Sequence, residues 1–435
     1  MAKQKVTIFW FRRDLRLDDN RGLYHALKGD FPVLPVFVFD KNILNDLSDK
    51  SDARVSFIHQ ELTEINSELE GKGTRLQTFY TSPEKAFKSL LEEYDIQQVH
   101  TNRDYEPYAK ERDEKIAKSL GESVDFVTHK DQVIFEPDEV LKDDGTPYLV
   151  YTPYSKKWLA TVTEKDYESY TSALQFENWL HVDYEVIISL EKMGFGPTKI
   201  ELPGKELRKE TIEQYADERN FPAKDSTSRL GIHYRFGTIS IRKMAAKAAK
   251  SEENTYLKEL IWREFFMCIL YHFPKVVENN YSAKYDGVKW RNNEEEFEKW
   301  KTGQTGYPLV DAGMRELNQT GFMHNRVRML VASFLTKHLL IDWKWGEAYF
   351  AEKLLDYELS SNNGNWQWSA GTGVDAQPYF RVFNPTTQID KFDKNRIYIK
   401  KWVPEYGTDR YPDEMVEHKM ARERALTTFK GGVNS

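Results

Sequence analysis

Short apolar runs alternate with amphipathic stretches over the first 130 residues of the sequence. Five runs rich in β-branched and aromatic residues predict strands, at 6–11, 32–39, 75–81, 97–102 and 124–129. Between the later runs, apolar residues recur every three or four positions over 52–69 and 83–95, which predicts helices. Strands that alternate with helices favour a parallel sheet with helices on both faces, so we expect a doubly wound α/β domain over 1–130.

The rest of the chain has a different pattern. Over 131–205 the alternation fades, and the segment is polar and punctuated by proline, which predicts a long connector. From 206 to 435 the apolar spacing is helical, most clearly at 257–273, 309–321, 325–346 and 348–359. We therefore expect an all-α C-terminal domain, joined to the α/β domain by the connector.

Composition and charge restrict the class of protein. Of the 435 residues, 40% are hydrophobic and 30% are charged, which is typical of a globular chain. The 62 Lys and Arg residues against 69 Asp and Glu residues give a formal net charge of −7. Any contact with nucleic acid must therefore come from a local basic patch.

Missing sequence features narrow the class further. Cys268 is the single cysteine and there is no CxxC or HExxH motif, so neither a disulfide nor a metal site is expected. The segment 11–20 lacks GxGxxG, so ordinary dinucleotide binding after the first strand is not expected. No apolar run approaches the ~18–20 residues of a membrane helix, and the start does not resemble a secretory signal. A cytoplasmic protein is predicted.

A basic segment is the first candidate for binding. Residues 219–250 contain eight Lys or Arg residues and a single acid, Asp225. Such a run is as often a solvated helix face as a binding surface. Within it, TSRLG at 227–231 stands where a loop enters a helix, so free N–H groups and the Thr227 and Ser228 hydroxyls can hold phosphate. A phosphate-bearing cofactor or a DNA backbone fits this segment.

Polar residues near tryptophans are the second candidate. Eight of the eleven tryptophans fall in the helical half, where they can be core residues, stacking surfaces or electron relays. The segment 356–388 is polar, bears glycine and is rich in side-chain amides, with three asparagines around Gly364. We interpret it as a binding loop, because these residues favour turns and supply hydrogen-bonding groups.

The motif GFMHNRVRM at 321–329 is the third candidate. Asn325, Arg328 and Met329 are adjacent or three to four residues apart, so they lie near one face of a helix. Arg326 points elsewhere on that helix and is expected to meet phosphate.

Four motifs, taken in order, resemble those of the DNA photolyase and cryptochrome family: FRRDLRLDDN at 11–20, ELIWREF at 259–265 and the runs 305–329 and 362–388. Within the family they most resemble the class I cyclobutane pyrimidine dimer photolyases, and the match extends over nearly the whole chain. The resemblance implies an α/β domain that can hold an antenna pigment and a helical domain that buries FAD.

The resemblance also implies a set of FAD-binding residues. It comprises Tyr215, Thr227, Ser228, Arg229, Leu230, Gly231, Arg328, Asp356, Tyr357, Glu358 and Asn362. The 227–231 loop is expected to hold the FAD phosphates with Tyr215, and the loop ends in glycine where many relatives have serine. Arg328 is expected to pair with Asp356 beside the flavin, and Glu358 replaces the more frequent aspartate.

Redox roles follow from the same resemblance. Asn362 is assigned as catalytic, since it matches the residue facing flavin N5, where repair enzymes carry Asn and many light sensors carry Asp or Cys. An amide there favours the reduced anionic FAD that repair requires. Trp366, Trp343 and Trp290 match the chain that carries electrons from the protein surface to the flavin.

A substrate pocket is implied as well. Its lining and DNA rim comprise Arg219, Glu259, Trp262, Asn325, Arg326, Met329, Trp368 and Gln388. The family mechanism flips the dimer out of the duplex into this pocket, where an electron from excited reduced flavin opens the cyclobutane ring. Trp262 and Trp368 are expected to pack against the dimer, and Glu259, the second catalytic residue, to bind its carbonyl edge. Arg219 and Arg326 are expected to anchor phosphates.

Three alternative functions are less consistent with the residues. Enzymes for the (6–4) lesion carry paired histidines near MHNRVRM, where this sequence has only His324. A cryptochrome that signals without repair is opposed by Asn362, by the complete pocket set and by the lack of a long tail. A flavoprotein that binds DNA without turnover is opposed by the presence of Glu259 and Asn362. Light-driven repair of pyrimidine dimers is the predicted function.

The antenna pigment is not decided by the sequence. The segment 102–113 aligns with the family's antenna region, but the folate-contacting His and Glu are not seen, and Ala109 stands there. Folate, a deazaflavin, a second flavin and an empty pocket all stay open. The expected partner is UV-damaged DNA, bound at the nucleoid in the cytoplasm by a monomer that has no obligate protein partner.

Overall fold

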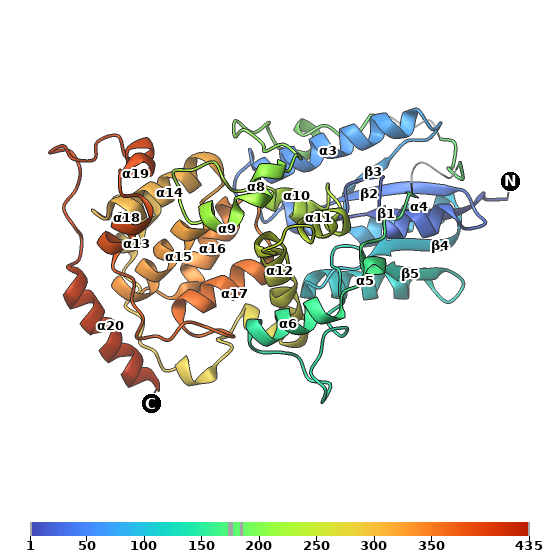
Figure 1. Cartoon of the computed structure of the whole chain (residues 1–435). Coiled ribbons are helices and arrows are strands. Elements are labelled where there is room, and N and C mark those ends of the chain that lie inside the picture. Colours follow the sequence, from blue (N-terminus) through green and yellow to red (C-terminus); the bar gives the residue numbers. More distant parts are fainter. Residues whose placement is uncertain (1, 173–176, 183–185, 434–435) are drawn as a thin grey trace. The chain divides into compact units, whose positions relative to one another are not determined.

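The computed structural model describes residues 2–172, 177–182 and 186–433. The chain forms two compact units, whose elements are labelled in Figure 1. The first comprises Met1–Glu139, Thr161–Lys205 and Leu230–Lys250, and the second Val140–Ala160, Glu206–Arg229 and Ser251–Ser435. The segment predicted as a connector contributes to both units. None of the helices in the described part of the chain combines the length and apolar character needed to span a membrane.

A five-stranded parallel sheet forms the centre of the first unit (Figure 1). Its strands are β1 (Lys5–Phe11), β2 (Val33–Asp40), β3 (Gln77–Thr81), β4 (Asp95–Asn102) and β5 (Asp125–His129). They lie in the order β3-β2-β1-β4-β5, and Ile8 of β1 is in register with Leu34 of β2 and Val99 of β4. All five predicted strands are confirmed, with ends within two residues of those predicted.

Helices cover both faces of this sheet. The α-helices of the unit include α1 (Arg21–Leu27), α2 (Lys41–Leu44), α3 (Ala53–Glu70), α4 (Pro83–Glu93), α5 (Pro107–Leu120), α10 (Gly231–Phe236) and α11 (Ile241–Ala248). Successive side chains of a strand point to opposite faces. Accordingly, Phe9 and Phe11 pack with α1 and α3, whereas Ile8 and Trp10 pack with α4 and α5. The predicted doubly wound architecture is confirmed.

A buried charge network holds α11 in the first unit. The guanidinium of Arg242 is buried and donates to carboxylate oxygens of Asp19 at 3.0 Å and Asp131 at 2.8 Å. Arg16 donates to the other oxygen of Asp131 at 2.6 Å. Burial alone raises the pKa of Asp131, but the charges of Arg16 and Arg242 outweigh it and hold that pKa below its usual value. The network is therefore ionised and paired.

We expect replacement of Arg242 by leucine to destabilise the protein, because it leaves buried carboxylates without their cation. Removing one partner of a buried ion pair costs ~3–5 kcal/mol, which lowers the thermal midpoint by several degrees. Lys243→Leu is the control, since Lys243 pairs with Asp18 at the surface, where a pair contributes ~0–1 kcal/mol. Thermal unfolding followed by circular dichroism compares the two variants, and equal midpoints would contradict the role of Arg242.

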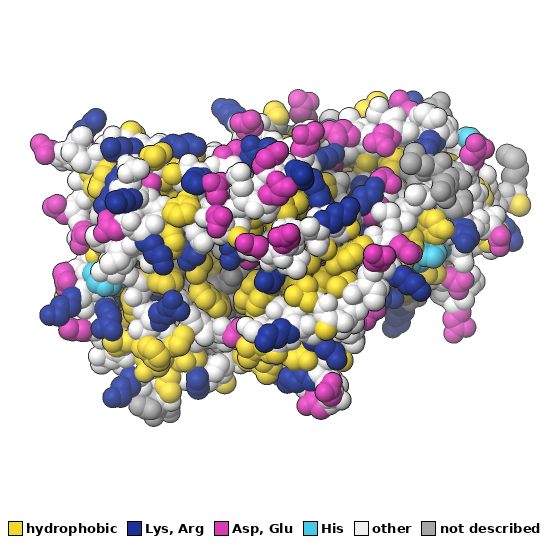
Figure 2. Space-filling model, in the orientation of Figure 1, with side chains coloured by type: hydrophobic (Ala, Val, Ile, Leu, Met, Phe, Trp, Pro, Cys, Tyr) yellow, Lys and Arg dark blue, Asp and Glu magenta, His cyan; other side chains and the backbone are white. Residues whose placement is uncertain are grey.

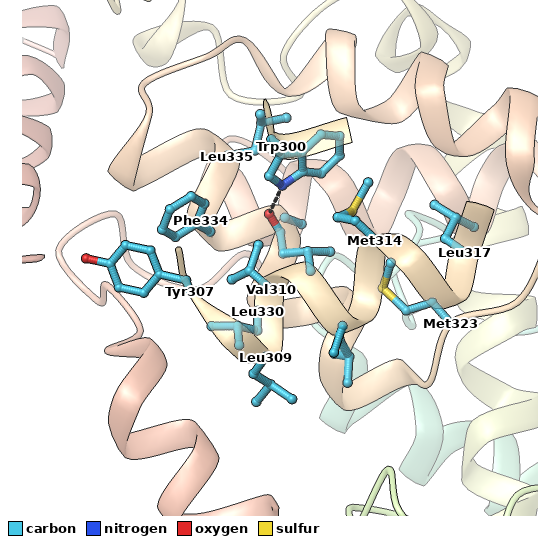
Figure 3. Packing of buried hydrophobic residues seen from close by; sticks show 14 of the residues in the cluster. Trp300, Tyr307, Leu309, Val310, Met314, Leu317, Met323, Leu330, Phe334 and Leu335 are labelled. Carbon is cyan, nitrogen blue, oxygen red and sulfur yellow. Dashed lines mark hydrogen bonds between the residues drawn. The ribbon is translucent and has the colours of Figure 1, made fainter. Parts of the chain in front are cut away.

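Helices make up the second unit. They include α6 (Tyr151–Thr161), α8 (Lys209–Glu213), α9 (Tyr215–Glu218), α12 (Thr255–His272), α13 (Glu294–Thr302), α14 (Pro308–Thr320), α15 (Asn325–Ser333), α16 (Trp343–Lys353), α17 (Leu359–Ala370), α18 (Pro385–Phe392), α19 (Ile397–Trp402) and α20 (His418–Val433). The core contains the fully buried Trp300, whose indole N–H donates to the Val331 carbonyl at 3.1 Å (Figure 3). The predicted all-α architecture is confirmed.

One predicted helical run, 325–346, is divided. After α15 the chain makes a π-helical turn, and Leu340 then takes a left-handed φ of 50°. A new helix, α16, begins at Trp343, where the Asp342 side chain accepts from a backbone N–H as N-cap. The apolar spacing continues through the break because the connection is buried like a helix face. The run 348–359 is divided as well, because α16 ends at Lys353 and α17 begins at Leu359.

The segment 356–388, interpreted as a binding loop, instead contains a helix. α17 spans Leu359–Ala370, and Asn362 and Asn363 lie buried within it rather than in a turn. The Asn363 amide donates to the Val276 carbonyl at 2.9 Å. A tertiary partner thus satisfies a side chain that otherwise competes with helical hydrogen bonds. The loop interpretation is wrong for this stretch.

Candidate active site

A cavity in the second unit brings together five of the eleven predicted flavin residues and three of the eight predicted substrate residues. It contains about 570 Å³, part of it open to solvent. Its lining comprises Asn325, Arg328, Met329, Ala332, Phe350, Leu354, Asp356, Tyr357, Glu358, Ser361, Asn362, Asn365, Trp366, Trp368 and Ser369. These residues come from α15, α16, α17 and the turn between α16 and α17. As predicted, Asn325, Arg328 and Met329 face the same side of α15.

An ion pair crosses one wall of the cavity. Arg328 donates to both carboxylate oxygens of Asp356, at 3.1 and 2.8 Å, as the resemblance predicts. The third guanidinium position, Nε, donates to the Met323 carbonyl at 2.7 Å. A bidentate pair fixes the plane of the guanidinium as well as its position. The cavity therefore has a rigid, planar cation in its wall.

The amide of Asn362 is oriented by a glutamate that the sequence analysis missed. Its Nδ2 donates to the Glu347 side chain at 2.8 Å and to the Glu347 backbone carbonyl at 3.1 Å. Both amide hydrogens are thereby used, so only Oδ1 is left as an acceptor for a ligand in the cavity. Burial raises the pKa of Glu347, against the opposing effect of the Asn362 hydrogen bond. No motif marks Glu347, because its role comes from the packing of α16 on α17.

Glu358 begins the helix that carries Asn362. Its carboxylate accepts from the backbone N–H groups of Ser360 at 3.1 Å and Ser361 at 2.8 Å, and from the Ser360 hydroxyl at 2.5 Å. An acceptor at the N-cap satisfies helix N–H groups that otherwise lack partners. The structure thus places Glu358 both in the cavity lining and at the start of α17.

The three tryptophans predicted as an electron relay occupy different surroundings. Trp366 lines the cavity and contacts Phe350 and Trp300 edge-on, at ring distances of 5.0 and 6.1 Å. Trp343 is buried and its indole N–H donates to Asn280 at 2.9 Å. Trp290 is half-buried and contacts Phe429 edge-on at 5.6 Å. The aromatic contact of Trp366 with Trp300 was not predicted, since spacing in the sequence does not place these two rings together.

The predicted DNA and substrate residues on α9 and α12 form a second group. Glu259 is ion-paired with Arg219, which ends α9 and also lies over the Tyr215 ring at 5.6 Å. Each partner of the ion pair keeps about one third of its side chain exposed (33% and 34%). One turn further along α12, the half-buried Trp262 stacks on Tyr151. The roles predicted separately for Arg219 and Glu259 are therefore coupled.

Arg326 and its neighbours form the start of α15. The Arg326 guanidinium donates to Asn220 and lies 4.5 Å from the centre of the Phe392 ring. The His324 side chain is the N-cap, because its Nδ1 accepts from the Arg326 backbone N–H at 3.1 Å. Burial first, and then the nearby arginine charges, lower the pKa of His324 to about 4. A neutral histidine thus orients the helix that carries the arginines.

The remaining predicted residues lie outside the cavity lining. Gln388 is half-buried on α18, and its backbone N–H donates to Asn384. In the loop predicted to hold phosphate, Arg229 has a positive φ of 53° and its guanidinium lies 4.9 Å from the Phe322 ring. The loop leads into α10 at Gly231, as predicted. Within the described ranges, no three His, Cys, Asp or Glu side chains are placed to hold a metal ion.

Comparison with known proteins decides the family. A profile described as the FAD binding domain of DNA photolyase matches residues 256–409, and one described as DNA photolyase matches 7–171. The deoxyribodipyrimidine photo-lyase of a Synechococcus strain is 36% identical, over 96% of this chain and 95% of that protein. The chain belongs to the DNA photolyase family. The family resemblance read from the four motifs is therefore confirmed, together with an FAD-binding domain.

Solved photolyase structures have the same fold. A class III photolyase from Agrobacterium tumefaciens matches with a TM-score of 0.90 and 34% identity, over 100% of this chain and 99% of that one. A photolyase from Sulfolobus tokodaii, described with two FAD molecules, matches with a TM-score of 0.81 and 35% identity, over 98% and 99%. A Synechocystis cryptochrome, at 24% identity and a TM-score of 0.87 over 98% and 100%, shares the fold.

We expect acid to destabilise this photolyase through His324. The pKa of His324 is about 4 in the folded protein and 6.5 when the side chain is exposed. Below pH 6.5 the unfolded chain therefore binds a proton that the folded protein does not, and the free energy of unfolding falls as the pH falls toward 4. The loss amounts to about 3 kcal/mol at the acid limit. His324→Asn keeps an acceptor for the Arg326 N–H but does not titrate. Thermal unfolding from about pH 7.5 to 4.5 should therefore show a flatter profile for the variant, and parallel profiles would contradict the assignment.

Proposed function

We propose that the chain repairs cyclobutane pyrimidine dimers in DNA by light-driven electron transfer from reduced FAD. One observation carries the proposal: a single cavity joins residues suited to a flavin with residues assigned to the lesion. The first set is the Arg328–Asp356 pair and Asn362, and the second is Asn325, Met329 and Trp368. Relatives that match over nearly the whole chain are named deoxyribodipyrimidine photo-lyase, which supports this substrate.

The residues of the cavity fit a flavin. Ala332, Phe350 and Leu354 offer an apolar wall, which suits a flat ring system. Arg328, held by Asp356, supplies a fixed positive charge near an anionic ring. The Nδ2 group of Asn362 is held by Glu347, so its Oδ1 is the atom available to a ligand. This oxygen can accept a hydrogen bond from a protonated nitrogen of the flavin. FAD, when bound and reduced, supplies an excited-state electron on absorbing blue light.

The lesion pocket combines aromatic walls with a carboxylate. Trp368 of α17 and Trp262 of α12 are assigned to pack against the dimer, which must leave the base stack at a cost of a few kcal/mol. The Glu259 carboxylate is oriented by its contact with Arg219 and offers acceptor oxygens to a ligand. Its partner on the lesion is then the base N–H that lies between the carbonyl groups.

Phosphate contacts are assigned to Arg219 and Arg326. Both guanidinium groups are partly exposed and each is held by a neighbour, Glu259 or Asn220. Figure 2 shows Lys and Arg side chains interspersed with Asp and Glu over the face drawn. Binding through a few fixed arginines is consistent with that mixture and with the net charge of −7.

The proposal includes finer assignments. Trp366, Trp343 and Trp290 form an electron relay to the surface, and Tyr215 and the 227–231 loop hold the FAD phosphates. The protein acts as a monomer in the cytoplasm, on damaged DNA at the nucleoid. Pigments extracted from purified protein identify any second chromophore, and light scattering gives the oligomeric state.

Repair of a dimer-containing oligothymidine under blue light is the decisive test. The chemically reduced protein is expected to restore thymine absorbance only in the light. Glu259→Ala should keep FAD but lose lesion affinity about tenfold, because a hydrogen bond to a charged group contributes ~1.5–3 kcal/mol. Glu253→Ala, an exposed glutamate just before α12, is the control. No recovery by wild-type protein that holds reduced FAD would refute the function, whereas unchanged affinity in Glu259→Ala would refute only that role.

Arg326→Ala tests the phosphate contact separately. We expect weaker binding of lesion DNA and a salt dependence reduced by about one unit in the slope of log K against log salt. Lys299→Ala removes an exposed lysine paired with Glu295 and should leave the slope unchanged. Fluorescence anisotropy at several salt concentrations gives both slopes. An unaltered slope in Arg326→Ala would mean that this arginine does not contact phosphate.

A further inference from the structure

One face of α6 packs on α12 through three aromatic residues. Tyr151, Tyr154 and Trp158 are spaced by three and four positions, so they lie on the same side of α6. The Trp158 indole donates to the Glu264 carboxylate at 2.7 Å, and the Tyr154 ring lies 5.3 Å from that of Phe265. Tyr154 and Trp158 are almost fully buried, at 2% and 1% exposure, whereas Tyr151 at the start of the helix is half-buried. The first two anchor the helix, and Tyr151 has a different environment.

Tyr151 contacts the turn of α12 that bears two predicted pocket residues. Its ring lies parallel to the indole of Trp262, with ring centres 3.6 Å apart and planes 8° from each other. Its hydroxyl donates to the carbonyl of Lys258 at 2.6 Å, one residue before Glu259. Both ends of the Glu259–Trp262 turn are thus in contact with one side chain.

A third contact fixes the backbone of Tyr151. Its N–H donates to the Asp375 carboxylate at 3.1 Å, in the segment after α17. Burial, and then the charge of Glu259, raise the pKa of the Tyr151 hydroxyl far above its usual value, so the hydroxyl keeps the proton that it donates. Tyr151 is therefore held in place while it holds α12.

We infer that Tyr151 is a positioning residue of the lesion pocket: it fixes the orientation of Trp262 and Glu259 before the flipped-out dimer enters. The inference rests on the proposed function, which makes these two residues the binding surface for the dimer. A half-exposed indole has several rotamers, and freezing one on binding costs affinity. Stacking on Tyr151 selects a rotamer in advance and covers one indole face, so the dimer meets the rest of the ring.

The contacts of Tyr151 separate this role from general packing. Loss of its ring removes the parallel ring that lies 3.6 Å from Trp262, while the more distant and tilted Phe266 ring at 5.4 Å and the two buried anchors of α6 stay in place. Loss of the hydroxyl alone removes one hydrogen bond to α12 and keeps the stacking. Asp375 is exposed and has a left-handed φ of 50°, which glycine adopts readily, so Asp375→Gly removes the backbone anchor without a packing change.

The experiment compares lesion affinity with affinity for undamaged DNA. Tyr151→Leu, Tyr151→Phe and Asp375→Gly holoproteins are titrated by fluorescence anisotropy with one oligonucleotide, with and without a single thymine dimer. We expect Tyr151→Leu to bind the lesion-containing oligonucleotide about tenfold more weakly than wild type. Its affinity for the undamaged oligonucleotide and its FAD spectrum should be unchanged. Tyr151→Phe should stay within about threefold of wild type, and Asp375→Gly should lose about two- to threefold. Tyr148→Leu is the control for general packing of α6, because the Tyr148 ring contacts the anchor residue Tyr154 edge-on. It should leave the lesion affinity unchanged.

Each outcome decides the inference. Wild-type lesion affinity in Tyr151→Leu, or equal loss for lesion and undamaged DNA, would overturn it while leaving the proposed function intact. If Tyr151→Leu loses FAD or melts early, Asp375→Gly decides, and unchanged lesion affinity in that variant overturns the inference. A wild-type protein that does not prefer lesion DNA refutes the proposed function and this inference with it.

Discussion

The bidentate ion pair between Arg328 and Asp356 is the interaction on which the rest of the candidate site depends. It joins α15 to the turn between α16 and α17, and the Met323 carbonyl holds the same guanidinium from the segment before α15. Two residues after Asp356, the Glu358 carboxylate caps α17. The position of α17 is thus linked to that of α15 by a short chain of charged hydrogen bonds. A lysine in place of Arg328 could not fix this plane, because its ammonium is a point charge.

The short helix α17 presents functional side chains on two opposite faces. Asn362, Trp366 and Ser369 are spaced by four and three residues and face the cavity. On the other side, the amide groups of Asn363 and Gln367 donate to the Val276 carbonyl, so that face is polar and yet fully hydrogen-bonded.

Close packing against the neighbouring helices requires small residues on both sides of α17. A Cβ on Gly364 would lie 2.2 Å from Phe266 of α12, and a Cβ on Gly346 of α16 would lie 2.1 Å from Trp366. Neither gap leaves room for a side chain. The cavity therefore keeps its shape because α17 cannot shift toward either neighbour.

The sequence predicts the parts of this site that depend on local periodicity. Short apolar runs rich in β-branched and aromatic residues located all five strands, and the spacing of Asn325, Arg328 and Met329 placed them on one helix face. Local rules failed where tertiary contacts decide the structure. Asn362 and Asn363 favour turns in isolation, but their amides bond to Glu347 and Val276, so the segment is helical. The partners Glu347 and Tyr151 carry no motif, since each acquires its role only when distant helices meet.

The pairing of Glu259 with Arg219 bears on the proposed contact of this carboxylate with the lesion. A carboxylate has two oxygens with about four acceptor sites, so an ion pair that uses one oxygen is compatible with a further hydrogen bond from a ligand. Arg219 donates to Oε1 of Glu259 and thereby orients the carboxylate. A fixed acceptor also discriminates, because a ligand that displaces its water without supplying a hydrogen bond loses free energy of binding. Specificity in such a pocket thus comes from the cost of the wrong occupant as much as from contacts with the right one.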